Sequence, residues 1–150
     1  MNSDSRQSIL IVEDSDDDYF ATERAFKKSC LLNPVYRCTN GDQALDFLFR
    51  RGVYADSESA PRPGMILLDL NLPGTDGRDV LGIIKSDQNL NLIPVIVLTT
   101  SDAEQDVARC YAAGANSYVK KPVNLTGFVE AIARLKEYWL EVALLPKELK

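Results

Sequence analysis

The chain has 150 residues and no histidine. This absence excludes nucleophilic catalysis by Ser–His or Cys–His pairs, acid–base catalysis by imidazole and most zinc sites. A metal ion bound here would need oxygen ligands, which favour Mg²⁺, Ca²⁺ or Mn²⁺. The chemistry of any functional site must therefore rest on carboxylates, hydroxyls and amines.

Cysteine, long apolar runs and clustered positive charge are also scarce. Cys30, Cys38 and Cys110 form no C-x-x-C pair and are expected to be reduced thiols. No apolar stretch approaches the roughly 20 residues of a membrane span, and residues 1–7 lack a signal-peptide core. The net charge of −5, without a basic stripe, argues against nucleic-acid binding. We therefore expect a cytoplasmic globular protein with neither membrane nor nucleic acid as a partner.

Five short apolar runs predict the strands of a buried sheet. Residues 8–12, 65–68 and 95–98 are almost continuously apolar, which is typical of parallel strands covered by helices on both faces. Residues 35–38 and 117–119 are weaker candidates. A helix-like segment follows each run, and this alternation predicts an α/β fold with a doubly wound, five-stranded parallel sheet.

Capping signals indicate where the five helices begin. Ser15, Thr39 and Ser101 each precede an acidic residue by three positions, and Asp76 and Asn124 can also act as caps. We find no internal repeat or linker, so residues 1–150 are expected to form one domain. Three segments are expected to lie outside the regular strands and helices of this domain: a flexible N-terminus (residues 1–7), a surface loop (52–64) and a C-terminal tail (141–150). Periodicity does not predict a secondary structure for residues 144–150 of this tail.

Polar side chains follow four of the five predicted strands. Glu13 and Asp14 end the first strand, Asp69 the third and Thr99 the fourth, while Lys121 lies just past the fifth. Functional sites in doubly wound sheets form at the carboxyl ends of the strands. We therefore expect these five side chains to lie at one edge of the sheet.

The composition of this group favours phosphoryl chemistry with a divalent cation. Three converging carboxylates repel one another unless a cation neutralises them, and Mg²⁺ prefers carboxylates, waters and a phosphate. The Thr99 hydroxyl and the Lys121 ammonium suit a transferring phosphoryl group. Asp69, which a buried strand projects alone, can act as a nucleophile that forms an aspartyl-phosphate.

The ordered set Glu13-Asp14, Asp69, Thr99 and Lys121-Pro122 resembles the receiver domain of two-component response regulators, a flavodoxin-like (βα)5 fold. The resemblance spans about residues 8–139. It implies that Asp69 accepts a phosphoryl group from a phosphohistidine of a sensor histidine kinase, which supplies the histidine this chain lacks. The stretches "PRPGMILLDLNLPGTDGRDVL", "IPVIVLTTS" and "YWLEVALLP" are similar to small standalone regulators paired with phytochrome-type kinases. Such a protein is a signalling phosphoacceptor rather than an enzyme, apart from its self-catalysed phosphotransfer and dephosphorylation.

The same resemblance implies a metal site. Asp14, Asp69 and the backbone carbonyl of Asn71 would hold Mg²⁺, and Glu13 would join directly or through water.

It also implies the residues that respond to the phosphoryl group. Thr99 would bond a phosphoryl oxygen, Lys121 would pair with it, and Tyr118 would be the aromatic switch that turns inward. The Lys121–Pro122 bond is expected to be cis. Thr100 stands where many receivers carry Ala or Gly, and its bulk is expected to hinder the attacking water and lengthen the phosphorylated lifetime.

Simpler interpretations remain open for each residue. Residues 13–14 could be acids at a helix start, Asp69 a cap for loop amides, Thr99 part of a polar turn, Lys121 a surface lysine and Tyr118 strand packing. Four further charged residues are expected to be solvated, namely Asp16, Asp17, Asp18 and Lys120.

Three other functions also remain open. "DLNLPGT" is similar to the D-x-D-x-T signature of phosphatases, but Asn71 replaces their second acid. A flavin mononucleotide carrier would need a Ser/Thr- and Gly-rich phosphate loop where this chain has acids. A receiver-like adaptor that works without phosphate is the remaining alternative.

The last predicted helix has more apolar side chains than one face can bury. Its core stripe is expected to comprise Phe128, Ile132, Leu135 and Trp139. The remaining apolar residues predict homodimerisation through this helix and the tail; they are Tyr138, Leu140, Val142, Leu144 and Leu145.

Overall fold

The computed structural model describes residues 7–56, 58–142 and 145–146. Its strands are β1 (Ile9–Val12), β2 (Val35–Cys38), β3 (Met65–Leu68), β4 (Val95–Thr99) and β5 (Ser117–Lys120). The α-helices are α1 (Asp16–Lys28), α2 (Gly41–Phe49), α3 (Gly77–Ser86), α4 (Glu104–Ala112) and α5 (Leu125–Lys136). Two short helical segments are a 3₁₀ turn, η1 (Gly52–Tyr54), and a π-helical segment, η2 (Glu137–Val142).

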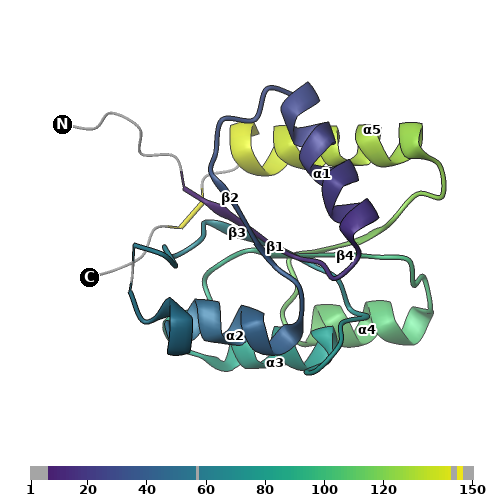
Figure 1. Cartoon of the computed structure of the whole chain (residues 1–150). Helices are drawn as coiled ribbons and strands as arrows, with labels where there is room; N and C mark the ends of the chain where they lie inside the picture. The colour runs from purple at the N-terminus through teal and green to yellow at the C-terminus, as the bar shows by residue number, and fades with distance from the viewer. Residues whose placement is uncertain (1–6, 57, 143–144, 147–150) are drawn as a thin grey trace.

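The strands form one parallel sheet in the order β2-β1-β3-β4-β5. Helices α1 and α5 cover one face, and α2, α3 and α4 cover the other (Figure 1). This arrangement confirms the predicted doubly wound sheet, and each predicted strand differs from the observed one by at most one residue at an end. The strand order reverses between β1 and β3, so the loops after these parallel strands share one edge but lead to helices on opposite faces, which is where sites form in such sheets.

Side chains of the central strands alternate between two hydrophobic cores. Ile9 and Ile11 pack with Phe26 of α1 and with residues of α5, whereas Leu10 and Val12 pack with residues of α2 and α3. Both faces of β1 are therefore buried, which explains its continuous apolar sequence. Burying each such side chain contributes about 1.5–3 kcal/mol, and this rigid strand fixes the residues that follow it.

Three of the predicted helix caps are confirmed, and two are wrong. Ser15, Asp76 and Asn124 cap α1, α3 and α5 by accepting backbone N–H groups of the first turn. In α2, Asn40 caps the helix instead of Thr39, whose hydroxyl and amide both bond Gln43. In α4, Ala103 occupies the cap position, because the Ser101 hydroxyl donates a hydrogen bond to the Asp106 carboxylate.

The loop between α2 and β3 is anchored by side chains at both of its ends. Tyr54 in η1 packs edge-on against Phe47 of α2, with ring centroids 5.1 Å apart. Arg50 donates a hydrogen bond to the carbonyl of Ala60 (3.1 Å), and Arg62 donates one to the carbonyl of Leu48 (2.8 Å). These contacts fix its described residues against α2.

The predicted apolar stripe of α5 is largely buried. Phe128, Ile132 and Leu135 are buried, and Trp139 in η2 packs partly buried against the same core. In the described part of the chain, no helix is long and apolar enough to cross a membrane.

The Lys121–Pro122 bond is trans, because no peptide bond among the described residues is cis. The cis expectation is therefore wrong; the two isomers of an X–Pro bond differ by only about 0.5–1 kcal/mol, so sequence alone did not determine which one forms.

Two glycines of α3 provide a test of how tightly this helix packs beneath the candidate site. A Cβ on Gly77 would lie 2.3 Å from the Asp69 carbonyl oxygen, whereas a Cβ on Gly82 would meet nothing within 4 Å. We expect Gly77→Ala to lower the free energy of unfolding by about 2 kcal/mol through overpacking. Gly82→Ala should raise it by about 0.5–1 kcal/mol through helix propensity. Urea denaturation followed by circular dichroism measures both, and equal effects would contradict the packing described here.

Candidate functional site

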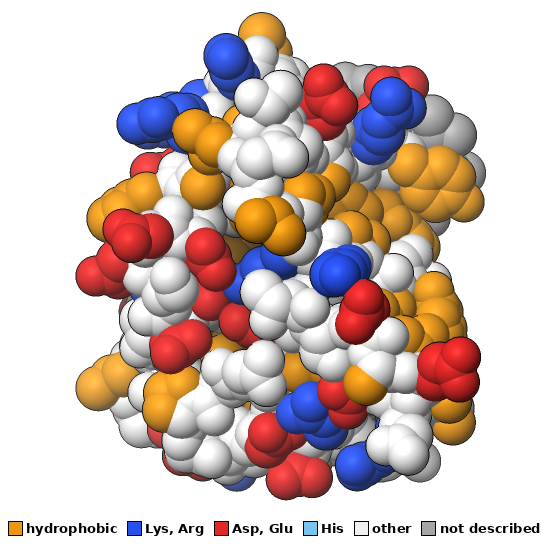
Figure 2. All heavy atoms as spheres, turned by 90° about the vertical axis from the view of Figure 1, so that its right-hand side faces the viewer, with side chains coloured by type: hydrophobic (Ala, Val, Ile, Leu, Met, Phe, Trp, Pro, Cys, Tyr) orange, Lys and Arg blue, Asp and Glu red, His pale blue; other side chains and the backbone are white. Residues whose placement is uncertain are grey.

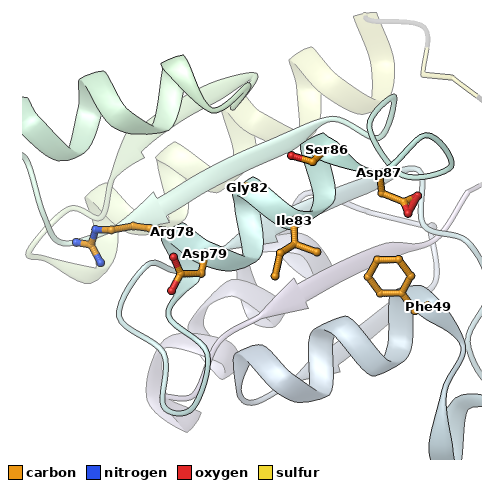
Figure 3. A pocket seen from close by; sticks show the side chains of 7 residues that line it. All are labelled: Phe49, Arg78, Asp79, Gly82, Ile83, Ser86 and Asp87. Carbon is orange, nitrogen blue, oxygen red and sulfur yellow. The ribbon is translucent and has the colours of Figure 1, made fainter.

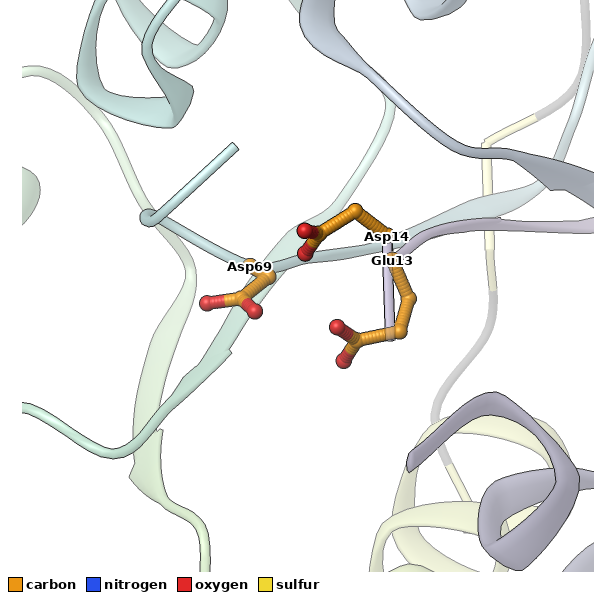
Figure 4. A group of neighbouring side chains, drawn as sticks. All are labelled: Glu13, Asp14 and Asp69. Atoms are coloured by element: carbon orange, nitrogen blue, oxygen red, sulfur yellow. The ribbon is translucent and has the colours of Figure 1, made fainter. Parts of the chain in front are cut away.

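The ends of β1 and β3 bring three carboxylates together. Glu13 and Asp14 follow β1, Asp69 follows β3, and these strands are neighbours in the sheet. Carboxylate oxygens of the three residues lie within 4.8 Å of one another. Figure 4 shows the side chains projecting from the two strand ends into the same space. The convergence predicted for this sheet edge is confirmed for these residues.

The exposure of the three acids differs. Glu13 is 4% exposed and Asp69 8%, whereas Asp14 is exposed. The Asp69 amide donates to the Val12 carbonyl (3.1 Å), and one Asp69 oxygen accepts the Asn71 amide at 3.3 Å. Asn71 itself is exposed in the loop after β3. The acidic group is therefore open to solvent at Asp14, whereas Glu13 and Asp69 are buried beside it.

The Lys121 side chain enters this group from the loop after β5. Its ammonium lies 2.5 Å from Glu13 Oε1 and 3.2 Å from Asp69 Oδ2, and the residue is 5% exposed. Its backbone amide donates to the Thr99 carbonyl (2.7 Å), which holds the loop against the end of β4. Lys121 is therefore no surface lysine, whereas Lys120 is exposed as predicted and pairs with Asp102.

Burial and charge shift the pKa values of this cluster. Burial raises the pKa of the Glu13 carboxyl to about 7, although the nearby Lys121 ammonium opposes this. Burial alone would lower the pKa of Lys121, but its contacts with Glu13 and Asp18 raise it above the usual value. The three carboxyl groups of Glu13, Asp14 and Asp69 outnumber the single ammonium of Lys121 here, and carboxylate oxygens are the ligands that a hard divalent cation prefers.

The contact between Lys121 and Asp18 corrects one prediction. Asp18, in the first turn of α1, lies 2.9 Å from the Lys121 ammonium instead of being only solvated. Asp16 pairs with Arg37 at 2.8 Å, and Asp17 is exposed. The sequence gives no local signal for the Asp18 contact, because its partner lies 103 positions further along the chain.

The hydroxyl residues at the end of β4 lie beside the cluster. Thr99 is completely buried, and its hydroxyl has no hydrogen-bond partner among the described residues. Thr100 is exposed at the rim. Buried hydroxyls are normally hydrogen-bonded, so the Thr99 hydroxyl is free to bond a group that arrives at this edge.

Tyr118 connects β5 to the loop after β4. It is partly buried, and its hydroxyl donates to the Ser101 carbonyl at 2.8 Å. The Ser101 hydroxyl in turn bonds Asp106, which accepts two hydrogen bonds of 2.8 Å from Arg78 of α3. The Arg78 guanidinium lowers the pKa of Asp106 to about 2. Neither Arg78 nor Asp106 was predicted from the sequence to belong to this site, although their network links α3, α4 and β5.

Figure 2 looks onto the edge at which the strands end, where acidic side chains gather beside a few basic and apolar ones.

A separate groove runs along α3 and faces Phe49 of α2 (Figure 3). It is lined by Phe49, Arg78, Asp79, Gly82, Ile83, Ser86 and Asp87. None of the predicted site residues lines this groove, so the acidic edge is the candidate functional site.

Comparisons with known proteins agree with this geometry. Residues 9–133 match the model of the response regulator receiver domain. The chain is 41% identical over 138 residues to the response regulator Rcp1 of Synechocystis sp., covering 92% of each protein.

Solved structures are similar over nearly the whole chain. The phosphorylated cyanobacterial phytochrome response regulator RcpA has a TM-score of 0.90 and 39% identity, with 95% of this chain and 100% of that chain covered. The Mn²⁺-bound form of Rcp1 has a TM-score of 0.88 and 40% identity, with 94% and 99% covered. These similarities extend beyond the shared fold to a common family.

Proposed function

The chain belongs to the family of response regulator receiver domains, and from this premise we propose that Asp69 accepts a phosphoryl group from the phosphohistidine of a sensor histidine kinase. One observation carries the proposal. The Asp69 carboxylate is aimed by a buried strand at an edge where it meets a lysine ammonium and two further carboxylates. This set supplies a nucleophile, a cation for the phosphoryl oxygens and ligands for a metal ion.

The donor set fits Mg²⁺. Asp14, Asp69 and the backbone carbonyl of Asn71 would hold the ion, with Glu13 as a direct or water-mediated ligand, and all these atoms are hard oxygen donors. When bound, Mg²⁺ neutralises the carboxylates and the charge of the incoming phosphoryl oxygens. The 4.8 Å spread of the carboxylate oxygens supports this assignment.

The transfer itself is an in-line displacement. A carboxylate oxygen of Asp69 forms a bond to phosphorus while the phosphorus–nitrogen bond to the donor imidazole breaks, and that nitrogen keeps the electron pair. Lys121 donates N–H groups to the phosphoryl oxygens as negative charge builds on them. The Thr99 hydroxyl, which has no partner among the described residues, donates to another phosphoryl oxygen.

The hydrogen-bond network at Tyr118 can transmit the effect of phosphorylation from Asp69 to the protein surface. Moving Thr99 toward the phosphoryl group shifts the loop that carries Ser101, whose carbonyl and hydroxyl hold Tyr118 and Asp106. The phosphorylated protein therefore presents a different surface of α4, β5 and α5 to its partners.

We further propose that the cognate kinase is a phytochrome-type photoreceptor. RcpA, which is 39% identical to this chain, is described as a phytochrome response regulator. The signal would then pass by protein–protein contact.

Intact-mass measurement tests the central assignment. After incubation with Mg²⁺ and a small acyl-phosphate donor, we expect one added phosphoryl mass on the wild-type chain and none on Asp69→Asn. Phosphorylation of both proteins would show that a residue other than Asp69 accepts the phosphoryl group. If neither gains mass with this donor or with a panel of histidine kinases, the chain is a phosphate-independent adaptor.

Thr100 provides a test of the phosphorylated lifetime. Its exposed side chain at the rim is expected to hinder the water that hydrolyses the aspartyl-phosphate. We expect Thr100→Ala to lose its phosphoryl mass faster than the wild type once the donor is removed, whereas Thr126→Ala, which changes an exposed threonine of α5, should not. An unchanged rate in Thr100→Ala would dispose of this role.

Self-association is a separate proposal that rests on the end of the chain. Tyr138 is 55% exposed and packs edge-on against Trp139, with ring centroids 5.2 Å apart. Leu140 is partly buried. The structure does not describe the side chain of Val142, and Leu144 lies outside the described residues. The exposed tyrosine face supports a homodimer formed by α5, η2 and the tail.

Sedimentation velocity tests the dimer. We expect the full chain to self-associate at high concentration, and truncation after Leu140 or the substitution Tyr138→Ser to weaken this association. Leu32→Ser, which changes an exposed leucine between α1 and β2, serves as the control. A wild-type monomer at high concentration, unchanged by truncation, would refute the proposal.

A further inference from the structure

The Lys121 ammonium makes one carboxylate contact that the proposed phosphotransfer does not use. It lies 2.5 Å from Glu13 Oε1, 2.9 Å from Asp18 Oδ2 and 3.2 Å from Asp69 Oδ2. Glu13 and Asp69 belong to the proposed metal site, whereas Asp18 lies outside it, on α1. When Glu13 and Asp69 bind a cation and a phosphoryl group, Asp18 is therefore the one of these three partners that can keep its ion pair with Lys121.

Asp18 is held firmly at the start of α1. Its amide donates to the Ser15 hydroxyl oxygen (3.2 Å), and its carbonyl accepts a hydrogen bond from the Thr22 hydroxyl (2.9 Å). The Ser15 amide donates to Glu13 Oε2 at 3.2 Å, so the helix start is also fixed relative to the acidic cluster. The Asp18 carboxylate thus has a defined position on the solvent side of Lys121, with 41% of its side chain exposed against 5% for Lys121.

The neighbouring acids of the same helical turn lack this contact. Asp16 pairs with Arg37. Asp17 is exposed, and its side chain makes no hydrogen bond or ion pair within the described ranges 7–56, 58–142 and 145–146. Because all three acids share the favourable interaction with the helix N-terminus, Asp17 is a matched control for the charge of Asp18.

We propose that Asp18 is a positioning residue for Lys121, and this inference rests on the proposed role of Asp69 as phosphoacceptor. When a divalent cation takes the oxygens of Glu13 and Asp69, Asp18 remains as a partner for the ammonium that these two carboxylates release. It also holds the ammonium at the mouth of the site, where the phosphoryl oxygens arrive. Without Asp18, the carboxylate partners of Lys121 in the described part of the chain are the two buried ones that the cation needs.

The test compares Asp18→Asn with Asp17→Asn in two measurements. Isothermal titration calorimetry with Mg²⁺ should give a dissociation constant at least 3-fold higher for Asp18→Asn than for Asp17→Asn. With the acyl-phosphate donor, Asp18→Asn should lower the maximal phosphorylation rate at least 3-fold more than Asp17→Asn, while the half-saturating donor concentration changes less than 2-fold. Asp18→Glu, which keeps the charge and still suits the first turn of a helix, should restore most of the rate.

The outcomes separate this inference from the proposed function. If Asp18→Asn and Asp17→Asn match in both measurements, Asp18 contributes only its charge or its place in the helix, and the positioning role is overturned. If Asp18→Glu is as slow as Asp18→Asn although both fold, the role is likewise overturned. If the wild-type chain takes no phosphoryl group, the proposed function fails, and the Mg²⁺ titration still decides whether Asp18 controls Lys121.

Discussion

The ion-pair cluster around Lys121 is the interaction on which this site depends. Two carboxylates, on Glu13 and Asp69, are buried at the ends of adjacent strands, and one ammonium lies between them. Buried charges are costly unless they are paired. The hydrophobic sheet forces these acids together, and the loop after β5 supplies the charge that makes their burial tolerable.

This balance of charge also explains how the site can respond to a ligand. A divalent cation bound here would neutralise the same carboxylates as the ammonium and would release Lys121 for another anion. The Thr99 hydroxyl, free among the described residues, and the chain of hydrogen bonds from Tyr118 to Arg78 would then carry the change outward. This route would couple chemistry at the strand ends to helices on the surface.

Most of the fold could be predicted from the sequence, because it follows from local patterns. Continuous apolar runs gave the parallel strands, and their order along the chain placed Glu13, Asp14 and Asp69 at one edge. The caps predicted at Thr39 and Ser101 lie instead at Asn40 and Ala103, which local patterns did not indicate. Which residue caps a helix depends on backbone angles and on competing partners such as Gln43 and Asp106.

The contacts that the sequence did not reveal join residues far apart in the chain. Asp18 was expected to be solvated, yet it pairs with Lys121, and Arg78 reaches Asp106 on another helix. Such pairs depend on the relative placement of whole elements, to which periodicity and capping signals contribute nothing. The isomer of the Lys121–Pro122 bond likewise could not be predicted from local sequence. The cis and trans forms differ little in free energy, so the surrounding structure determines which one is found.

The central claim is that Lys121 and a divalent cation balance the same buried carboxylates. The most direct test is the free energy of unfolding of the wild type and of Lys121→Met, measured by urea denaturation across a Mg²⁺ titration. Without Mg²⁺, the variant should be less stable by about 3 kcal/mol, because two buried carboxylates lose their partner. Saturating Mg²⁺ should stabilise the variant more than the wild type, since no ammonium competes for the ligands. Equal stabilisation of both proteins by Mg²⁺ would contradict the account.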